Sequence, residues 1–280
     1  MAELVDYKGK RVVVSGCFSG MGEATARILL DLGAEVHGFD YKDCALPLAS
    51  FTRVDLRDEA SIDAAVGGLS GQFDALFNCA GLPGNMPLLD VMKVNYLAVR
   101  KVTSAIAPML KEGSAVASIS STAGNAWMTR LATHLELAAT PDFASGFRWC
   151  EDNIDKIFER YTFGKEALIV WTMKEAAHLI KRGIRLNCIL PGPTQTPMMP
   201  EFEKQAPKSL LEATTQPINR FATPEEQARP LIFLNSPAAS YVNGVALQVD
   251  GGFTGGAVTG QLDMSLIAAG MGGETELSTA

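Results

Sequence analysis

The sequence predicts an α/β protein built on one doubly wound, seven-stranded parallel sheet with helices on both faces. Short β-branched or apolar runs recur along the chain, and stretches with apolar residues at three- and four-residue spacing separate most of them. Nearly every connection is short. This alternation is typical of βαβ units, whose crossover helices cover both faces of a parallel sheet. With 280 residues, 47% of them hydrophobic, the chain has ample material for one large domain.

Each run can be assigned to a strand or a helix of this alternation. The expected strands are Arg11–Ser15, Glu35–Phe39, Phe51–Val54, Ala75–Asn78, Ala115–Ser120, Ile184–Ile189 and Ala246–Val249. The expected helices are Gly20–Leu32, Asp58–Leu69, Asn95–Leu110, Tyr161–Lys181 and Pro224–Leu234. We expect a single domain over residues 1–252, interrupted by an insertion at 125–160 and a lid at 192–220, with a Gly-rich tail at 253–280.

The composition excludes several classes of protein. Lys and Arg number 24 against 31 Asp and Glu, and the net charge of −7 disfavours a surface that tracks nucleic-acid phosphates. The five scattered cysteines form no C-x-x-C pair, and with only three histidines they predict reduced thiols and no metal site. We find neither the order of a signal peptide nor the ~18 uncharged apolar residues of a membrane span. We therefore expect a cytoplasmic protein without nucleic-acid or membrane partners.

A glycine-rich turn joins the first expected strand to the first helix. It reads Ser15-Gly16-Cys17-Phe18-Ser19-Gly20-Met21-Gly22. The free N–H groups and the positive dipole end of such a helix suit a pyrophosphate. Because Gly-rich turns of this kind also arise from packing alone, the motif by itself leaves a purely structural turn open.

Asp40 ends the second strand about 20 residues beyond this turn, at the position where a carboxylate binds the ribose diol of a dinucleotide and repels a 2′-phosphate. The glycine-rich turn contains no Arg or Lys to hold such a phosphate, although Lys42 follows closely. The two features predict a Rossmann-type, dinucleotide-binding and catalytic domain that prefers NAD to NADP. A solvated loop acid is the alternative for Asp40.

Tyr161 and Lys165 are four residues apart and therefore on one face of an expected helix. Such a pair also arises by chance, as an aromatic ring packed on a lysine stem. Three further motifs favour an active site, because each lies at or after the end of an expected strand. They are Asn78-Cys79-Ala80-Gly81, Ser120-Ser121 and Pro191-Gly192. Because the carboxyl ends of parallel strands meet at one edge, one crevice can collect them all.

In this order the motifs resemble the short-chain dehydrogenase/reductase family, and the resemblance extends to Asp250-Gly251-Gly252. It implies that Tyr161 is the catalytic acid/base and that Ser121 orients the substrate oxygen. It further implies that Lys165 lowers the tyrosine pKa and binds the nicotinamide ribose, and that Asn95 holds a water linking Lys165 to solvent.

The same resemblance implies a set of cofactor contacts. Asp55 would lie at the adenine, Asn78, Ala80 and Gly81 beside the adenosine ribose, and Ile189 and Thr196 at the carboxamide. The expected cofactor-binding residues are Ser15, Gly16, Ser19, Gly20, Met21, Gly22, Asp40, Asp55, Leu56, Asn78, Ala80, Gly81, Tyr161, Lys165, Ile189, Pro191, Gly192, Thr194 and Thr196.

The chemistry agrees with these roles. Oxidation of an alcohol requires removal of the hydroxyl proton, and a free tyrosine titrates near pKa ~10, too high for a base at neutral pH. A lysine ammonium and an oxidised nicotinamide ring nearby both favour the phenolate. This reaction needs no metal.

Two features depart from the common family pattern. Ser15 stands where the family usually has Thr, and Ser121 and Tyr161 are separated by 40 positions (121 to 161), a longer gap than most members have. The long gap is similar to that of a subgroup that contains coniferyl-alcohol dehydrogenase and 3α-hydroxysteroid dehydrogenase/carbonyl reductase. The motifs of this sequence are more similar to those of coniferyl-alcohol dehydrogenase. The insertion carries apolar side chains such as Trp127, which either wall a substrate pocket or pack on the domain or a neighbouring subunit.

The resemblance thus implies an NAD-dependent oxidoreductase that interconverts an aromatic or allylic alcohol, such as a coniferyl-type alcohol, and its carbonyl. A hydroxysteroid dehydrogenase/carbonyl reductase is the alternative substrate assignment, and a catalytically silent NAD(H)-binding sensor or scaffold is the alternative from another class. The family usually pairs subunits through the helices corresponding to Asn95–Leu110 and Tyr161–Lys181. With Leu168, Ile169 and Trp171 as apolar surface, we expect a homodimer or homotetramer.

Overall fold

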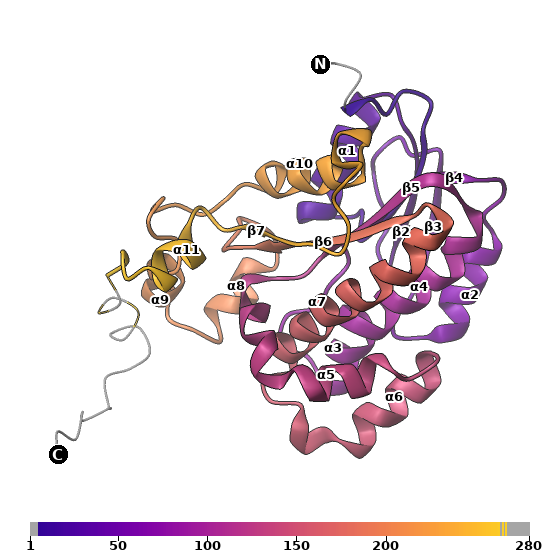
Figure 1. Ribbon diagram of the computed structural model, residues 1–280. Helices are drawn as coiled ribbons and strands as arrows, with labels where there is room; N and C mark the ends of the chain where they lie inside the picture. Colours follow the sequence, from indigo (N-terminus) through magenta and orange to yellow (C-terminus); the bar gives the residue numbers. More distant parts are fainter. Residues whose placement is uncertain (1–4, 264, 266, 268–280) are drawn as a thin grey trace, which may run out of the picture.

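A seven-stranded, wholly parallel sheet forms the centre of the protein. The computed structural model describes residues 5–263, 265 and 267, and its strands follow the order β3-β2-β1-β4-β5-β6-β7 (Figure 1). The strands are β1 (Arg11–Ser15), β2 (Glu35–Asp40), β3 (Ser50–Arg53), β4 (Phe73–Asn78), β5 (Leu110–Ile119), β6 (Arg185–Pro191) and β7 (Ala246–Val249). The strand order reverses between β1 and β4, so the predicted doubly wound fold is confirmed.

Helices cover both faces of the sheet. One face carries α1 (Gly20–Asp31) and α10 (Pro224–Asn235), which pack against each other (Figure 1). The other carries α2 (Glu59–Gly67), α4 (Ala98–Ile106) and α7 (Arg160–Leu179). Each central strand therefore needs apolar side chains on both sides, which is why these strands read as almost continuous apolar runs.

The core lies in two layers, one on each side of the sheet. In β1, Val13 belongs to the layer under α2, α4 and α7, whereas Val12 and Val14 belong to the layer under α1 and α10. All three side chains are fully buried. The two-residue period of a strand places neighbours on opposite faces, so the valine run fills both layers at once.

Two elements have a boundary more than two residues from the one predicted. Strand β5 begins at Leu110 rather than Ala115, because Leu110 already pairs with Phe73 before an irregularity in the register. The expected helix Asn95–Leu110 instead runs from Leu88 to Ile106 in three parts: α3 (Leu88–Met92), the π-helix η2 (Lys93–Leu97) and α4. A polar strand start and a π-helix carry no signal in hydrophobic periodicity.

The predicted insertion is helical. It contains the long 3₁₀ helix η4 (Thr122–Arg130), α5 (Leu131–Ala138), α6 (Phe143–Asp152) and the short 3₁₀ helix η5 (Ile154–Lys156). Helix α6 begins with a capping box in which Asp142 and Ser145 each bind the other's backbone N–H. The insertion packs on α7, and α6 also contacts α3, η2 and α4.

The predicted lid contains two short helices, α8 (Met199–Glu203) and α9 (Lys208–Ala213). In the predicted tail, α11 spans Phe253–Val258, while positions 264, 266 and 268–280 lie outside the described residues. No helix in the described part of the chain has the length and hydropathy to cross a lipid bilayer. Within those residues we also find no group of three or more His, Cys, Asp or Glu side chains arranged to hold a metal ion.

Candidate active site

Tyr161 and Lys165 lie one turn apart near the start of α7, beside the carboxyl end of β5. The Lys165 ammonium is 5.5 Å from the centre of the Tyr161 ring and donates a hydrogen bond of 2.8 Å to the Ile119 carbonyl. Ser121 follows β5 and caps η4, where its Oγ accepts from the Ala123 N–H at 3.1 Å. The three predicted catalytic side chains from separate parts of the sequence therefore meet at one place.

The surroundings shift the proton affinities of two of these groups. Burial raises the pKa of Tyr161, and a hydrogen bond with Ser121 partly offsets that rise. Burial lowers the pKa of Lys165 to about 8, since an ammonium in a dry site loses its hydration. Perturbed groups that adjoin one another at the carboxyl edge of a sheet are typical of an active site.

Asn95, the fourth predicted catalytic residue, lies in the π-helix η2 and is buried. Its side-chain amide accepts from the Leu82 N–H at 2.7 Å and donates to the Leu82 carbonyl at 2.9 Å. The amide therefore holds the loop after β4 in place, and it is already paired on both sides. Its predicted role in holding a water for Lys165 remains a prediction.

The glycine-rich turn between β1 and α1 brings backbone close to backbone. A Cβ on Gly16 would lie 2.5 Å from the Ala80 nitrogen, and one on Gly22 would lie 2.0 Å from the Gly16 carbonyl oxygen. The Ser19 side chain makes no cap to the N-terminus of α1, although Ser19 occupies the N-cap position. Glycine is required at these close approaches, and the uncapped helix end fits a pyrophosphate.

Asp40 lies next to that turn, at the end of β2. Its Oδ2 accepts from the Phe18 N–H at 2.9 Å, and its Oδ1 accepts from the Lys42 N–H at 3.0 Å. The Lys42 ammonium is 5.2 Å from the centre of the Phe18 ring. The backbone thus fixes the carboxylate at the mouth of the turn, which suits a ribose diol.

The other predicted contacts near the adenosine end are half-buried. The Asp55 carboxylate forms a 2.7 Å ion pair with Arg57, and hydrogen bonds from Arg57 lower its pKa. Leu56 packs against the core, and Met21 does so on the opposite face. Ala80 and Gly81 lie in the loop after β4, where Ala80 touches the glycine-rich turn.

Two predicted cofactor contacts, Asn78 and Ile189, have side chains that lie in the interior, so their contacts with a cofactor remain a prediction. Asn78 is 2% exposed and donates to Thr103 and Ser118, so it ties β4 to α4 and β5. Ile189 is fully buried in β6 and belongs to the core. Side chains at strand ends alternate between crevice and core, and the motif alone did not reveal which side each residue takes.

The segment after β6 folds over the crevice. Buried Pro191 ends the strand, Gly192 donates to the Val249 carbonyl, and the Thr194 hydroxyl donates to the Gly192 carbonyl at 2.9 Å. Thr196 lies over the glycine-rich turn, where its Cγ2 would be 3.3 Å from a Cβ on Gly20. The predicted cofactor end and the predicted lid are therefore in contact.

The predicted lid also contacts Tyr161, the predicted catalytic tyrosine. The Phe202 ring meets the Tyr161 ring edge-on, with centroids 5.3 Å apart, and Asn85 donates to the Glu201 carboxylate at 2.6 Å. Gln205 reaches Gly84, because a Cβ on that glycine would lie 2.8 Å from Oε1 of Gln205. Sequence reasoning did not single out Phe202, Gln205 or Asn85, since short irregular helices carry no periodic signal.

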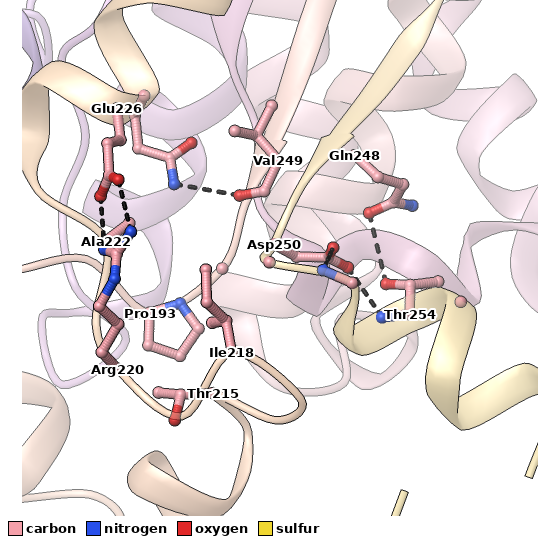
Figure 2. A pocket seen from close by; sticks show the side chains of 15 residues that line it. Pro193, Thr215, Ile218, Arg220, Ala222, Glu226, Gln248, Val249, Asp250 and Thr254 are labelled. Carbon is pink, nitrogen blue, oxygen red and sulfur yellow. Dashed lines mark hydrogen bonds and ion pairs between the residues drawn. The ribbon is translucent and has the colours of Figure 1, made fainter. Parts of the chain in front are cut away.

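A cavity of about 660 Å³ lies on the far side of the lid, between its last residues and the turn after β7 (Figure 2). Pro193 and Ile218 line it, the Arg220–Glu226 ion pair of 2.6 Å closes one side, and Asp250 binds the Thr254 N–H at the other. None of Ser121, Tyr161 and Lys165 lines this cavity. It is therefore separate from the predicted catalytic side chains, although Gly192, a predicted cofactor residue, lines it.

The insertion packs on the domain through its aromatic residues. Trp127 contacts the buried cluster of Ile169, Cys188 and Leu190, and Trp149 stacks on Phe163 with centroids 6.3 Å apart. Of the two readings of these aromatic residues, packing is the one that the structure shows for Trp127.

The insertion also covers the helix that was expected to pair subunits. Leu168, Ile169 and Trp171 are 0–5% exposed within one chain. The expectation that they offer apolar surface to another subunit is wrong, because α5 and η4 already occupy that face of α7.

Comparison with known proteins agrees with this architecture. Residues 10–133 match the family model described as short chain dehydrogenase, and residues 154–254 match that described as enoyl-(acyl carrier protein) reductase. The stretch between the two matches falls inside the insertion. A solved structure of a 3-alpha-hydroxysteroid dehydrogenase from Pseudomonas sp. B-0831, complexed with NADH, has the same fold, with a TM-score of 0.75 and 24% identity over 90% of this chain and all of that one.

Two curated relatives match over nearly their whole length. The coniferyl-alcohol dehydrogenase of a Pseudomonas species is 36% identical over 244 residues, covering 87% of this chain and 96% of that protein. The 3-alpha-hydroxysteroid dehydrogenase/carbonyl reductase of Comamonas testosteroni is 33% identical over 247 residues, covering 86% and 95%. Similarity of this extent, together with the site described above, shows that the chain belongs to the short-chain dehydrogenase/reductase family of oxidoreductases.

Proposed function

We propose that the protein is an NAD(H)-dependent alcohol dehydrogenase/carbonyl reductase whose substrate is an aromatic or allylic alcohol. The observation that carries the proposal is the convergence of Ser121, Tyr161 and Lys165, with the Phe202 ring set edge-on to Tyr161. The convergence supports the reaction, and the aromatic neighbour supports the substrate class.

The protein's side chains supply the proton chemistry. In oxidation, the Tyr161 oxygen removes the hydroxyl proton of the alcohol, and in reduction it returns that proton to the carbonyl oxygen. Ser121, which lies within hydrogen-bonding reach of Tyr161, would bind the same substrate oxygen and hold it in position. The charge of Lys165, 5.5 Å from the ring centre, favours the phenolate.

The dinucleotide supplies the hydride acceptor or donor when bound. Gly16, Gly20 and Gly22 keep the turn free of side chains, and the uncapped start of α1 offers N–H groups to a pyrophosphate. Asp40, fixed by two backbone N–H groups, supports NAD over NADP, because a 2′-phosphate beside a carboxylate is repelled.

The substrate class rests on the lid. From the lid, the Phe202 ring packs edge-on to Tyr161, and Gln205 approaches Gly84, which also lies next to Tyr161. A planar ring packs well on an aromatic edge, and a polyol would bury hydroxyls without partners at a cost of about 1–3 kcal/mol each. The relative named for coniferyl alcohol supports this choice, and the relative named for a hydroxysteroid makes a steroid the second candidate.

A catalytically silent NAD(H)-binding sensor has less support. Binding alone does not require Ser121 to hydrogen-bond Tyr161, nor a buried lysine beside the tyrosine ring. A sensor would bind NADH and leave every alcohol unoxidised, so turnover separates the two functions. We further propose that the protein acts in the cytoplasm as a homodimer or homotetramer, without nucleic-acid or membrane partners.

A cofactor-reduction screen tests the proposal. Steroid, cinnamyl, benzyl and terpene alcohols are offered with NAD and NADP in parallel, and absorbance reports the reduced dinucleotide. We expect the highest kcat/KM with NAD and a cinnamyl or benzyl alcohol. A preference for polyols contradicts the substrate class, and NADH binding without turnover of any alcohol supports the sensor.

A further inference from the structure

A buried charge cluster joins the insertion to the catalytic helix. Glu166 follows Lys165 on α7, and its side chain is fully buried. Its Oε2 accepts from Arg130 Nε at 2.9 Å and lies 2.8 Å from Nε2 of His134, and Arg130 Nη2 donates to Oε1. Arg130 ends η4 and His134 lies in α5, so one carboxylate binds two elements of the insertion.

The carboxylate is ionised in this setting. Burial raises the pKa of Glu166, but hydrogen bonds and charges from His134 and Arg130 outweigh it and bring the pKa below its ordinary value. His134 is also fully buried, and its Nδ1 has no partner among the described residues. Glu166 therefore accepts the hydrogen bond that Nε2 of the His134 ring donates.

Stability alone is a weak reason for such a cluster, because burying charges costs about as much free energy as their pairing returns. The length of η4 gives a stronger one. It is a 3₁₀ helix of nine residues, whereas runs beyond ~3–4 residues are uncommon because their hydrogen bonds are poorly aligned. A helix of this kind needs support from its neighbours, and Glu166 holds its last residue.

The support reaches the catalytic serine through η4. Ser121 caps the first turn of η4, and Ser120 next to it donates to the Lys165 carbonyl at 2.8 Å. In the middle, a Cβ on Gly124 would lie 3.1 Å from the Lys165 carbonyl carbon and 3.2 Å from the Glu166 nitrogen. The beginning, the middle and the end of η4 thus all rest on α7 at Lys165–Glu166.

We propose that Glu166 is a positioning residue: together with Arg130 and His134 it holds η4 on α7 in the register that puts the Ser121 hydroxyl against Tyr161. This inference rests on the proposed function, because it assigns Glu166 a part in placing the proton-transfer groups. Glu166 itself acts through Ser121 and does not contact the substrate.

The inference has a signature in the pH profile. The hydrogen bond from Ser121 lowers the Tyr161 pKa against the effect of burial, and the Lys165 ammonium is 5.5 Å from the centre of the ring. When η4 loosens, Tyr161 loses that hydrogen bond and keeps its proton to higher pH. Alcohol oxidation needs the deprotonated tyrosine, so its acid limb moves to higher pH.

The test compares Glu166→Gln with Glu136→Gln by kcat/KM against pH in alcohol oxidation. Glu136 is a matched control, since it lies in the same insertion but pairs with Lys156 at the surface. We expect E166Q to lower kcat on the order of 10- to 100-fold, as small misplacements of reacting groups do. We also expect the acid limb of its kcat/KM profile to move to higher pH, while its affinity for NADH stays unchanged. An E166Q profile that coincides with that of E136Q overturns the inference.

A double-mutant cycle with Ser121→Ala supplies the second readout. If Glu166 acts through Ser121, the E166Q/S121A double variant has the same kcat as S121A alone. A double variant whose loss of kcat is the product of the two single losses contradicts the inference. Should E166Q fail to fold, Arg130→Gln replaces it, because that side chain is 29% exposed and leaves the Glu166–His134 pair in place. Arg130→Lys should restore part of the rate, since it keeps the charge.

The two proposals fail in different ways. Wild-type protein that oxidises no alcohol removes the proposed function. Wild-type protein with a tyrosine-dependent pH profile that E166Q does not move removes the positioning role alone.

Discussion

Phe202 of the lid stands edge-on to Tyr161, with ring centroids 5.3 Å apart and ring planes at 76°. The two rings come from segments 41 positions apart, on opposite sides of β6 in the sequence (161 to 202). Because an aromatic edge on an aromatic face is a favourable contact, the lid can rest on the catalytic side chain. In the proposed function, Phe202 is therefore a neighbour of the substrate at the Tyr161 oxygen.

Tyr161→Phe should abolish turnover and leave NADH binding intact. The variant keeps the ring that packs against Phe202 but lacks the oxygen that accepts the proton, and such groups contribute ~10²–10⁴-fold. Steady-state rates and NADH fluorescence titration measure the two properties. Tyr241→Phe is the control, since Tyr241 is fully exposed. Retention of a tenth or more of the wild-type kcat would assign the proton transfer elsewhere.

Asp40→Ser should narrow the preference for NAD over NADP. The substitution removes the charge that repels a 2′-phosphate and keeps a small hydrogen-bonding group. The ratio of kcat/KM values for the two dinucleotides is the measurement. Asp43→Ser is the matched control, because Asp43 pairs with Arg53 at the surface. Equal use of both dinucleotides by the wild type would contradict this assignment.

Carbonyl reduction should lose kcat/KM above about pH 8. Burial holds the pKa of Lys165 at about 8, so its ammonium form predominates below that pH and disappears above it. Burial keeps the Tyr161 pKa high, and the tyrosine therefore retains the proton it must donate. Lys165→Arg should move the falling limb to higher pH, since a guanidinium stays charged. An unchanged limb in that variant would mean that another group titrates.

Phe202→Ala should raise KM for a cinnamyl alcohol more than for a short aliphatic alcohol, because only the former packs on the ring. Trp127→Ala should affect both alcohols equally and lower the melting temperature. Trp127 is half-buried against Ile169, Cys188 and Leu190, so its removal should cost less than the about 3–5 kcal/mol of a fully buried aromatic residue. The opposite pattern would restore the insertion as the pocket wall.

Light scattering at micromolar concentration should show a dimer or tetramer. Contact through Leu168, Ile169 and Trp171 is excluded by their burial within one chain, so the interface must use other surface. Exposed apolar residues of the insertion, such as Met128 and Phe158, offer one such surface. A monomer at this concentration would remove the proposal of a homo-oligomer.

The sheet was predictable because its rule is local. A strand buried on both faces must be apolar at successive positions, which makes the central strands recognisable. Six of the seven expected strands both begin and end within two residues of the observed ones. The start of β5 was missed because Leu110 is separated from the apolar run in the sequence by Lys111, Glu112 and Gly113. Its pairing with Phe73 is a long-range event without a local signal.

The site was predictable only as a set of residues. Ser121 could be assigned because it follows an expected strand, Tyr161 and Lys165 because they lie four residues apart on one expected helix, and the family resemblance implied their roles. The direction of Ile189, the lid contact of Phe202 and the pairing of His134 with Glu166 depend on three-dimensional packing. His134 in particular reads as an ordinary surface or packing residue until the buried carboxylate opposite it is known.

The π-helix η2 makes the position of Asn95 depend on how many residues the chain contains there. Removal of one residue between Lys93 and Leu97 would restore ordinary α-helical bonding and rotate α3 by about 100° against α4. The Asn95 amide would then turn away from Leu82, and the loop that approaches Lys165 would lose its clamp. In divergent evolution this stretch should therefore accept substitutions more readily than a change of length. A single-residue deletion would reveal this constraint on length, which an alanine scan cannot detect.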